Sequence, residues 1–135
     1  MTACIFCRIA EGMEQSYAIY EDKHVMAFLN HNPFSIGHTL IIPKKHYINM
    51  FDIDESAYLE VMQVVRLLLK TYEKKLGISG ADLLNLNGIE GQQTVFHFHV
   101  HLIPRRDGDE LVPWINSVPR NKYDFREIQK KLSLI

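Results

Sequence analysis

Three histidines alternate with apolar residues between Phe96 and Ile103, and this pattern constrains the chain more than any other feature. Successive side chains of a β-strand point to opposite faces, so His97, His99 and His101 would line one face at intervals of roughly 7 Å. Burying three imidazoles is costly unless each has a partner, and a purely structural strand would carry valine or isoleucine there. The pattern therefore favours a chemical role for this face.

Three interpretations of the histidines are open. The first is a strand with a solvent-facing polar side or a few satisfied core histidines, and strict alternation of three makes this the weakest. The second is a metal site, because His-x-His on a strand is a chelating geometry. The third is a phosphate-handling site in which one imidazole is the nucleophile and another the acid.

Composition limits the class of protein. A chain of 135 residues that is 47% hydrophobic and 23% charged is typical of a soluble protein, so we expect residues 1–135 to form one domain. A net charge of −1 gives no broad footprint for nucleic acid. No apolar stretch is long enough to cross a bilayer, and Arg8 and Glu11 argue against a signal peptide. We therefore expect a cytoplasmic protein with no nucleic-acid or membrane partner.

The apolar pattern predicts an antiparallel α+β fold. A long helix is indicated by apolar residues at helical spacing, with Asp54 as its N-cap and Gly77 at its end. A C-terminal helix is indicated by a capping box at Asp124, followed by Ile128, Leu132 and Ile135. About five strands are expected, with too few helices for parallel crossovers, at residues 17–20, 25–29, 39–43, 81–87 and 95–104.

The run His-φ-His-φ-His-φ-φ, with φ apolar, resembles the signature of the histidine-triad (HIT) superfamily of nucleotide hydrolases and transferases. The segment 37–46 resembles an earlier strand of that family, and Asn87-Gly88 followed by Gln93-Thr94-Val95 resembles its approach to the triad. The likeness covers nearly the whole chain. It implies a HIT-like fold, a single HIT domain and a homodimer.

The resemblance implies a role for each triad histidine. His99, the central one, would be the nucleophile and form a nucleotidyl-imidazole that water then hydrolyses. His101 would contact the phosphate and assist proton transfer, and the main chain near His97 would orient the ring of His99. A transferase branch has glutamine at the position of His101, so hydrolysis is favoured. Pro104-Arg105 resembles the bacterial-type hydrolases.

The implied substrate is a purine nucleoside phosphoramidate or a related nucleotide such as a dinucleoside polyphosphate. Asn87, Gln93 and Thr94 would contact the phosphate or the leaving group, and His38 either joins the site or is a surface residue. The family commonly has aspartate where this chain has Asn30, which offers one carbonyl acceptor and no charge to a ribose. Asn30 keeps open the alternative of a nucleotide-binding or protein-interaction module with little turnover.

Cys4 and Cys7 have the C-x₂-C spacing that suits two thiolates on one zinc ion. The same spacing fits a redox pair, for which the βαβ context is missing, or two small apolar anchors. In HIT relatives such a pair is completed by histidines at the positions of His46 and His97. The resemblance thus implies a closed structural zinc, which leaves His99 and His101 free and disfavours a catalytic metal held by the triad.

Overall fold

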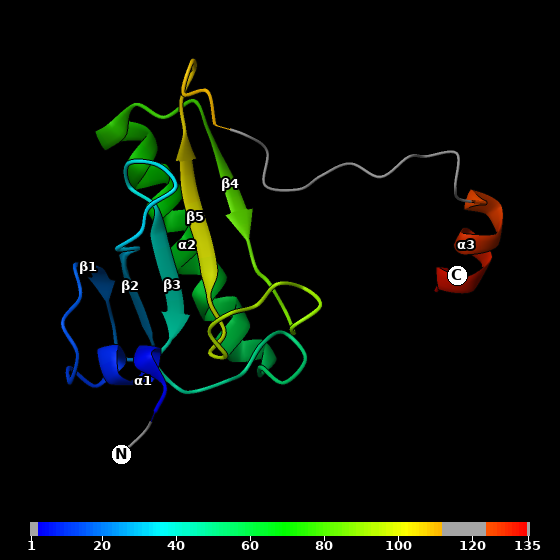
Figure 1. Cartoon of the computed structure of the whole chain (residues 1–135), viewed down its shortest axis with the longest axis horizontal. Helices are drawn as coiled ribbons and strands as arrows, with labels where there is room; N and C mark the ends of the chain where they lie inside the picture. Colours follow the sequence, from blue (N-terminus) through cyan, green and yellow to red (C-terminus); the bar gives the residue numbers. More distant parts are fainter. Residues whose placement is uncertain (1–2, 112–123, 135) are drawn as a thin grey trace.

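The protein is described by a computed structural model for residues 3–111 and 124–134. Five strands form one antiparallel sheet, and three helices accompany it in this part of the chain (Figure 1). In chain order the elements are α1 (Ile5–Ala10), β1 (Ala18–Glu21), β2 (Val25–Leu29), β3 (Thr39–Pro43), α2 (Glu55–Leu76), β4 (Gly80–Leu84), β5 (Val100–Arg105) and α3 (Phe125–Leu132).

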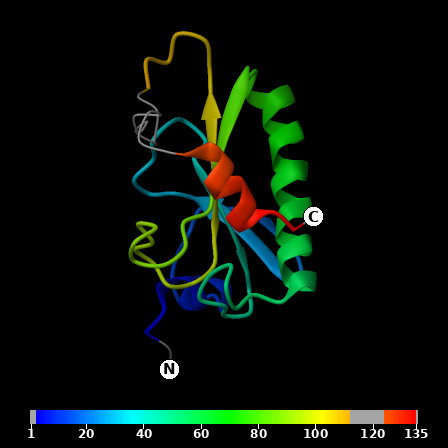
Figure 2. The same ribbon diagram turned by 90° about the vertical axis from the view of Figure 1, so that its right-hand side faces the viewer.

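The strands lie in the order β1-β2-β3-β5-β4, and all neighbours are antiparallel. The long helix α2 covers one face of this sheet (Figure 2), while α1 lies near the lower ends of β2 and β3 in the view of Figure 1. The turn from β3 to α2 (residues 44–54) and the turn from β4 to β5 (residues 85–99) lie at this same end, where hydrogen bonds join them. The fold is therefore the α+β arrangement that the sequence predicts.

Alternation along the strands divides the buried residues into two clusters. Val25 and Ala27 of β2 belong to the cluster that contains the buried face of α2. Met26 and Phe28 point the other way and join the cluster that contains Phe6 of α1. A sheet covered on both sides in this way buries apolar side chains from both of its faces.

Helix α2 has the ends that the sequence predicts. Asp54 is its N-cap, although its carboxylate accepts a hydrogen bond from the Tyr47 hydroxyl (3.0 Å) and makes no bond to the helix backbone. Gly77 ends the helix with a φ of 63°, a left-handed conformation that glycine adopts without steric cost.

Other elements differ from the prediction at their ends. Strand β4 stops at Leu84 rather than at residue 87, and β5 begins at Val100 rather than at residue 95. The backbone before β5 bonds to loops instead of to a strand, as shown by the Phe98 N–H, which donates to the Tyr47 carbonyl (2.7 Å). Helix α1 was not predicted at all.

Helix α3 is present and begins with the predicted cap, since the Asp124 carboxylate accepts from the backbone N–H groups of Arg126 and Glu127. Its described residues are all exposed, and Figure 1 shows it apart from the sheet. Ile135 lies outside the described residues. The apolar positions of α3 therefore add nothing to the two buried clusters.

Candidate functional site

The three histidines share one side of their segment although only His101 lies within β5. Phe98, Val100 and Leu102, which alternate with them, are buried in the cluster under α2. His97 and His99 point to the opposite side and are also buried, with 0% and 6% of their surface exposed. The alternation was thus predicted correctly, whereas the continuous strand from residue 95 was not.

A backbone carbonyl fixes the tautomer of His99. Its Nδ1 lies 2.7 Å from the carbonyl oxygen of His97, and because a carbonyl accepts only, Nδ1 must carry the proton and donate. The Nε2 atom of neutral His99 therefore keeps its lone pair. Burial lowers the pKa of His99, which favours this neutral form.

A chain of hydrogen bonds fixes His38 and His101 in the same way. The N–H of Phe34 donates to Nδ1 of His38 (2.9 Å), so the proton of neutral His38 lies on Nε2. That Nε2–H donates to Nδ1 of His101 (2.9 Å), which leaves the proton of neutral His101 on its own Nε2. Burial, followed by the neighbouring imidazoles of His99 and His38, lowers the pKa of His101 to about 3. Both rings are therefore neutral near pH 7, and His101 presents an N–H beside the lone pair of His99.

A cavity of about 1070 Å³ opens beside these two rings. Apolar side chains from α1, β2 and β3 form part of its wall, namely Ile5, Phe6, Ile9, Phe28, Leu29 and Leu40. Polar groups come from the 14–17 loop, from the loop that follows β2, and from the segment that carries Thr94, His99 and His101. A cavity that combines an apolar wall with converging polar groups is typical of a small-molecule site.

The cavity brings together five of the predicted site residues: Asn30, His38, Thr94, His99 and His101. Asn30 stands at the end of β2, where its Oδ1 accepts the N–H of Asn32 (3.0 Å) and its Nδ2 lies 3.5 Å from Nε2 of His38. The side-chain oxygen that was expected to meet a ribose is thus already bonded to the loop.

Asn87 and Gln93 are not among the residues that line the cavity. The amide of buried Gln93 donates to the carbonyls of Ile48 (2.7 Å) and Val95 (3.0 Å), and its oxygen accepts from the Gly88 N–H (2.8 Å) and the Asn49 amide (3.2 Å).

Asn87 is similarly engaged, because its Oδ1 accepts the Met50 N–H (2.7 Å) and its Nδ2 donates to the side-chain oxygen of Asn85 (2.8 Å). A substrate contact from Asn87 or Gln93 would require breaking these bonds. In the structure both side chains join the two turns at this end of the sheet.

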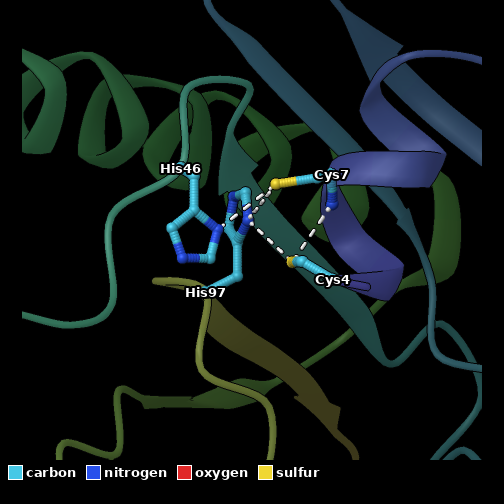
Figure 3. A group of neighbouring side chains, drawn as sticks. All are labelled: Cys4, Cys7, His46 and His97. Atoms are coloured by element: carbon cyan, nitrogen blue, oxygen red, sulfur yellow. Dashed lines mark hydrogen bonds between the residues drawn. The ribbon is translucent and has the colours of Figure 1, made fainter. Parts of the chain in front are cut away.

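A second cluster, of Cys4, Cys7, His46 and His97, lies next to the cavity. One ligand atom from each side chain lies within 4.8 Å of the others. Figure 3 shows the two cysteines extending from α1 towards the two imidazoles. Nε2 of His97 donates to the Pro43 carbonyl (2.8 Å), which leaves Nδ1 to face the sulfur atoms of Cys4 (3.4 Å) and Cys7 (3.5 Å). Two thiols and two imidazole nitrogens at this spacing fit the donor set of tetrahedral zinc.

Helix α1 connects this cluster to the cavity. Its N-cap is Cys4, whose sulfur accepts the N–H of Cys7 (3.3 Å). Phe6, between the two cysteines, contacts the rings of His99 and His97 edge-on at centroid distances of 5.1 and 5.9 Å. Helix α1 is not apparent from the sequence, because six residues are too few for a recognisable apolar period and cysteine is not a usual N-cap residue.

Residues 11–108, which are most of the chain, match the HIT domain family, and the protein belongs to this family. An uncharacterized HIT-like protein of Methanocaldococcus jannaschii is 41% identical over 131 residues, which cover 96% of this chain and 98% of the relative. The adenylylsulfatase HINT3 of Arabidopsis thaliana is 37% identical over 108 residues, which cover 80% of this chain and 55% of HINT3.

Among solved structures, a zinc-bound histidine triad family protein from Mycobacterium smegmatis has a TM-score of 0.79 and 32% identity, with 89% of this chain and 86% of that chain covered. The fold and the family expected from the sequence are therefore both confirmed. In the described residues, no helix is long and apolar enough to cross a membrane.

Proposed function

We propose that this protein hydrolyses a nucleotidyl bond, in a purine nucleoside phosphoramidate or a related nucleotide such as a dinucleoside polyphosphate. The observation that carries the proposal is the neutral His99 ring, whose Nδ1 is held by the His97 carbonyl while the ring lines the cavity. An imidazole with a free lone pair on Nε2 is a competent nucleophile near pH 7. The relationship to HINT3, named an adenylylsulfatase, supports a nucleotidyl substrate.

In the first step, Nε2 of His99 would form a bond to phosphorus as the bond from phosphorus to the leaving group breaks. The leaving group departs with the bonding electron pair and takes up a proton. In the second step, water attacks the nucleotidyl-imidazole, the P–N bond breaks, and the electron pair returns to Nε2 of His99. The products are the nucleoside monophosphate and the free leaving group.

His101 would assist both steps from the next ring. Neutral His101 has its proton on Nε2, because its Nδ1 accepts from His38, so it would donate a hydrogen bond to a phosphate oxygen. To protonate a leaving group as well, His101 would have to gain a second proton on Nδ1, which would replace the hydrogen bond from His38. The negative charge of a bound phosphate favours that imidazolium form. His38 thus acts by orienting His101.

The remaining substrate contacts follow from the lining of the cavity. The apolar wall, with Phe6 and Phe28, would hold a purine ring, and the Thr94 hydroxyl would donate to the phosphate. Asn30 would contact the ribose only through its amide protons unless its bond to the Asn32 N–H breaks.

We also propose that Cys4, Cys7, His46 and His97 hold one zinc ion. A closed site with four protein ligands has no open position for substrate, so the metal would stabilise α1 and the loop that carries His46. Metal-replete wild type should contain one zinc per chain, and Cys4→Ser should lose most of it. Equal zinc contents in the two proteins would show that this cluster does not bind the zinc ion.

Residues 1–135 would form one HIT domain that pairs into a homodimer. The position of β4 supports the proposed dimer, because this strand lies at an edge of the sheet and pairs only with β5 among the described residues. An unpaired edge of this kind is open to a second strand.

The test is product release from adenosine 5′-phosphoramidate and from a diadenosine polyphosphate, by wild type and by His99→Ala. We expect turnover of at least one substrate by wild type and none above background by His99→Ala. His24→Ala is the matched control, because His24 is exposed and its Nδ1 lies 2.9 Å from Oε2 of Glu60, away from the cavity. Folded, zinc-loaded wild type that binds AMP without turning over either substrate would instead indicate a nucleotide-binding module.

A further inference from the structure

The four-residue cluster and the cavity share one structural element, α1. Cys4 and Cys7 reach the cluster from this helix, whereas Ile5, Phe6 and Ile9 of the same helix line the cavity. A helix of six residues is not stable alone in water, so its position depends on what holds it. The hydrogen bonds from the two cysteine sulfurs to His46 and His97 are the polar part of that attachment.

Phe6 is a side chain of α1 whose ring contacts both the apolar wall and two of the histidines. It is 6% exposed and lies between the two cysteines in the sequence. Its ring contacts Phe28 of the apolar wall at 5.5 Å as well as the rings of His97 and His99. A displacement of α1 would therefore move the wall of the cavity and the ring packed on the edge of His99.

We propose that Phe6 is a positioning residue that couples metal binding at Cys4, Cys7, His46 and His97 to nucleotide binding in the cavity. The proposal rests on the function proposed above and adds a role for the metal beyond stability. With the metal bound, the two thiolates hold α1 against the sheet and Phe6 completes the apolar wall. Without the metal, α1 has lost that attachment and the wall is incomplete.

A second connection runs through His97, whose side chain belongs to the cluster and whose carbonyl orients His99. This connection acts on the reacting ring and meets the apolar wall only where the His97 ring contacts Phe6. Loss of metal would therefore affect turnover through both connections, whereas its effect on the apolar wall would pass through α1 and Phe6. The change in AMP affinity on zinc removal, compared between wild type and a variant at position 6, is thus the measurement that isolates Phe6.

The test is calorimetric titration of AMP into zinc-loaded and zinc-stripped protein. We expect zinc removal to weaken binding to wild type by roughly fivefold or more, the lower end of the range for coupled sites. In Phe6→Leu, zinc content should stay at one per chain while the ratio of the two affinities falls towards one, with Ile5 and Ile9 carrying what remains. Phe34→Leu is the matched control, because Phe34 also lines the cavity but belongs to the loop after β2, and it should keep the wild-type ratio.

If the zinc-stripped protein unfolds, replacing zinc with Co²⁺ provides a second test on folded protein. Binding is reciprocal, so AMP should perturb the visible spectrum of Co²⁺ at the cluster in wild type and in Phe34→Leu, but not in Phe6→Leu. Equal AMP affinities with and without zinc in folded wild type would overturn the coupling, as would an unchanged ratio or unchanged cobalt response in Phe6→Leu. Absence of hydrolysis would contradict the proposed function while leaving the AMP measurement decisive for the coupling.

Discussion

Single hydrogen bonds decide which nitrogen of each histidine carries a proton, and the bond from His38 to His101 is the one most open to test. His38→Ala would let the His101 proton reside on either nitrogen, so fewer molecules would present Nε2–H to the phosphate. We expect kcat to fall roughly tenfold, the effect of losing about 1.4 kcal/mol in the transition state. Steady-state kinetics would measure this, with His24→Ala as control, and an unchanged kcat would remove His38 from the mechanism.

The buried histidines also make stability depend on pH. The pKa of His101 is about 3 in the fold, because of burial and then of His99 and His38, against an ordinary value of 6.5. Between these values the unfolded chain binds the proton and the fold does not. The contribution of neutral His101 to the free energy of unfolding is therefore fully present above about pH 6.5 and is lost as the pH falls towards 3.

We expect urea titrations between pH 7 and pH 5 to show a decreasing free energy of unfolding. In His101→Gln this decrease should be shallower by up to about 1.4 kcal/mol per pH unit, the contribution of one proton. Parallel slopes for the two proteins, both loaded with zinc, would show that His101 does not contribute.

The residues of the site were predictable to different degrees. His99 and His101 follow from the alternating pattern together with the family likeness, because both depend on local sequence. The role of Gln93 was not predictable, because it is set by backbone groups of residues 48 and 88 that only the folded chain brings near. The contacts of Phe6 with His97 and His99 were likewise not predictable, since they join residues about 90 positions apart that only the folded chain brings near.

At the scale of elements, the turn between β4 and β5 depends on one close backbone contact. A Cβ at Gly91 would overlap the carbonyl oxygen of Asn87, and backbone atoms cannot yield as a side chain can. We expect Gly91→Ala to lower the free energy of unfolding by about 1–3 kcal/mol, as overpacking does.

Gly80→Ala is the matched control, because a Cβ there would meet its nearest neighbour at an ordinary 3.9 Å. Chemical denaturation of both variants beside wild type would measure the difference. Equal stability of the two alanine variants would contradict this prediction. It would show that the turn that carries Thr94 can rearrange around a Cβ at position 91.

Some helix and strand ends could be predicted because they depend on nearby residues, and others could not because they depend on distant ones. The ends of α2 were predicted because the apolar period and the residues Asp54 and Gly77 agree. The start of β5 was not, because alternation continues through residues 95–99 while their backbone bonds to loops. The Asn85 side chain, for example, donates to the His99 carbonyl (2.9 Å). An alternating sequence pattern predicts to which side each side chain points. It does not predict which group the backbone of that residue hydrogen-bonds.

For the molecule as a whole, the outer edge of β4 is where we expect a second copy to pair. Leu83 lies on this strand with 44% of its surface exposed. Lysine on an edge strand opposes pairing, so Leu83→Lys should shift the protein from dimer towards monomer in sedimentation equilibrium. Leu67→Lys on α2, where Leu67 is 50% exposed, is the control and should remain dimeric. A wild type that sediments as a monomer would contradict the dimer itself.

The bond from the Gly88 N–H to Gln93 also bears on how the protein ages. An asparagine followed by glycine is chemically labile, because the glycine nitrogen can attack the side-chain amide carbon and expel ammonia, and water then opens the resulting succinimide ring to isoaspartate or aspartate. Here that nitrogen is held 2.8 Å from Oε1 of Gln93, and the Asn87 amide is held by Met50 and Asn85. Native protein stored at 37 °C should therefore accumulate isoaspartate at position 87 far more slowly than Gln93→Ala or the urea-unfolded chain, as peptide mapping would show. The bonds that join the two turns would then set the chemical lifetime of the molecule.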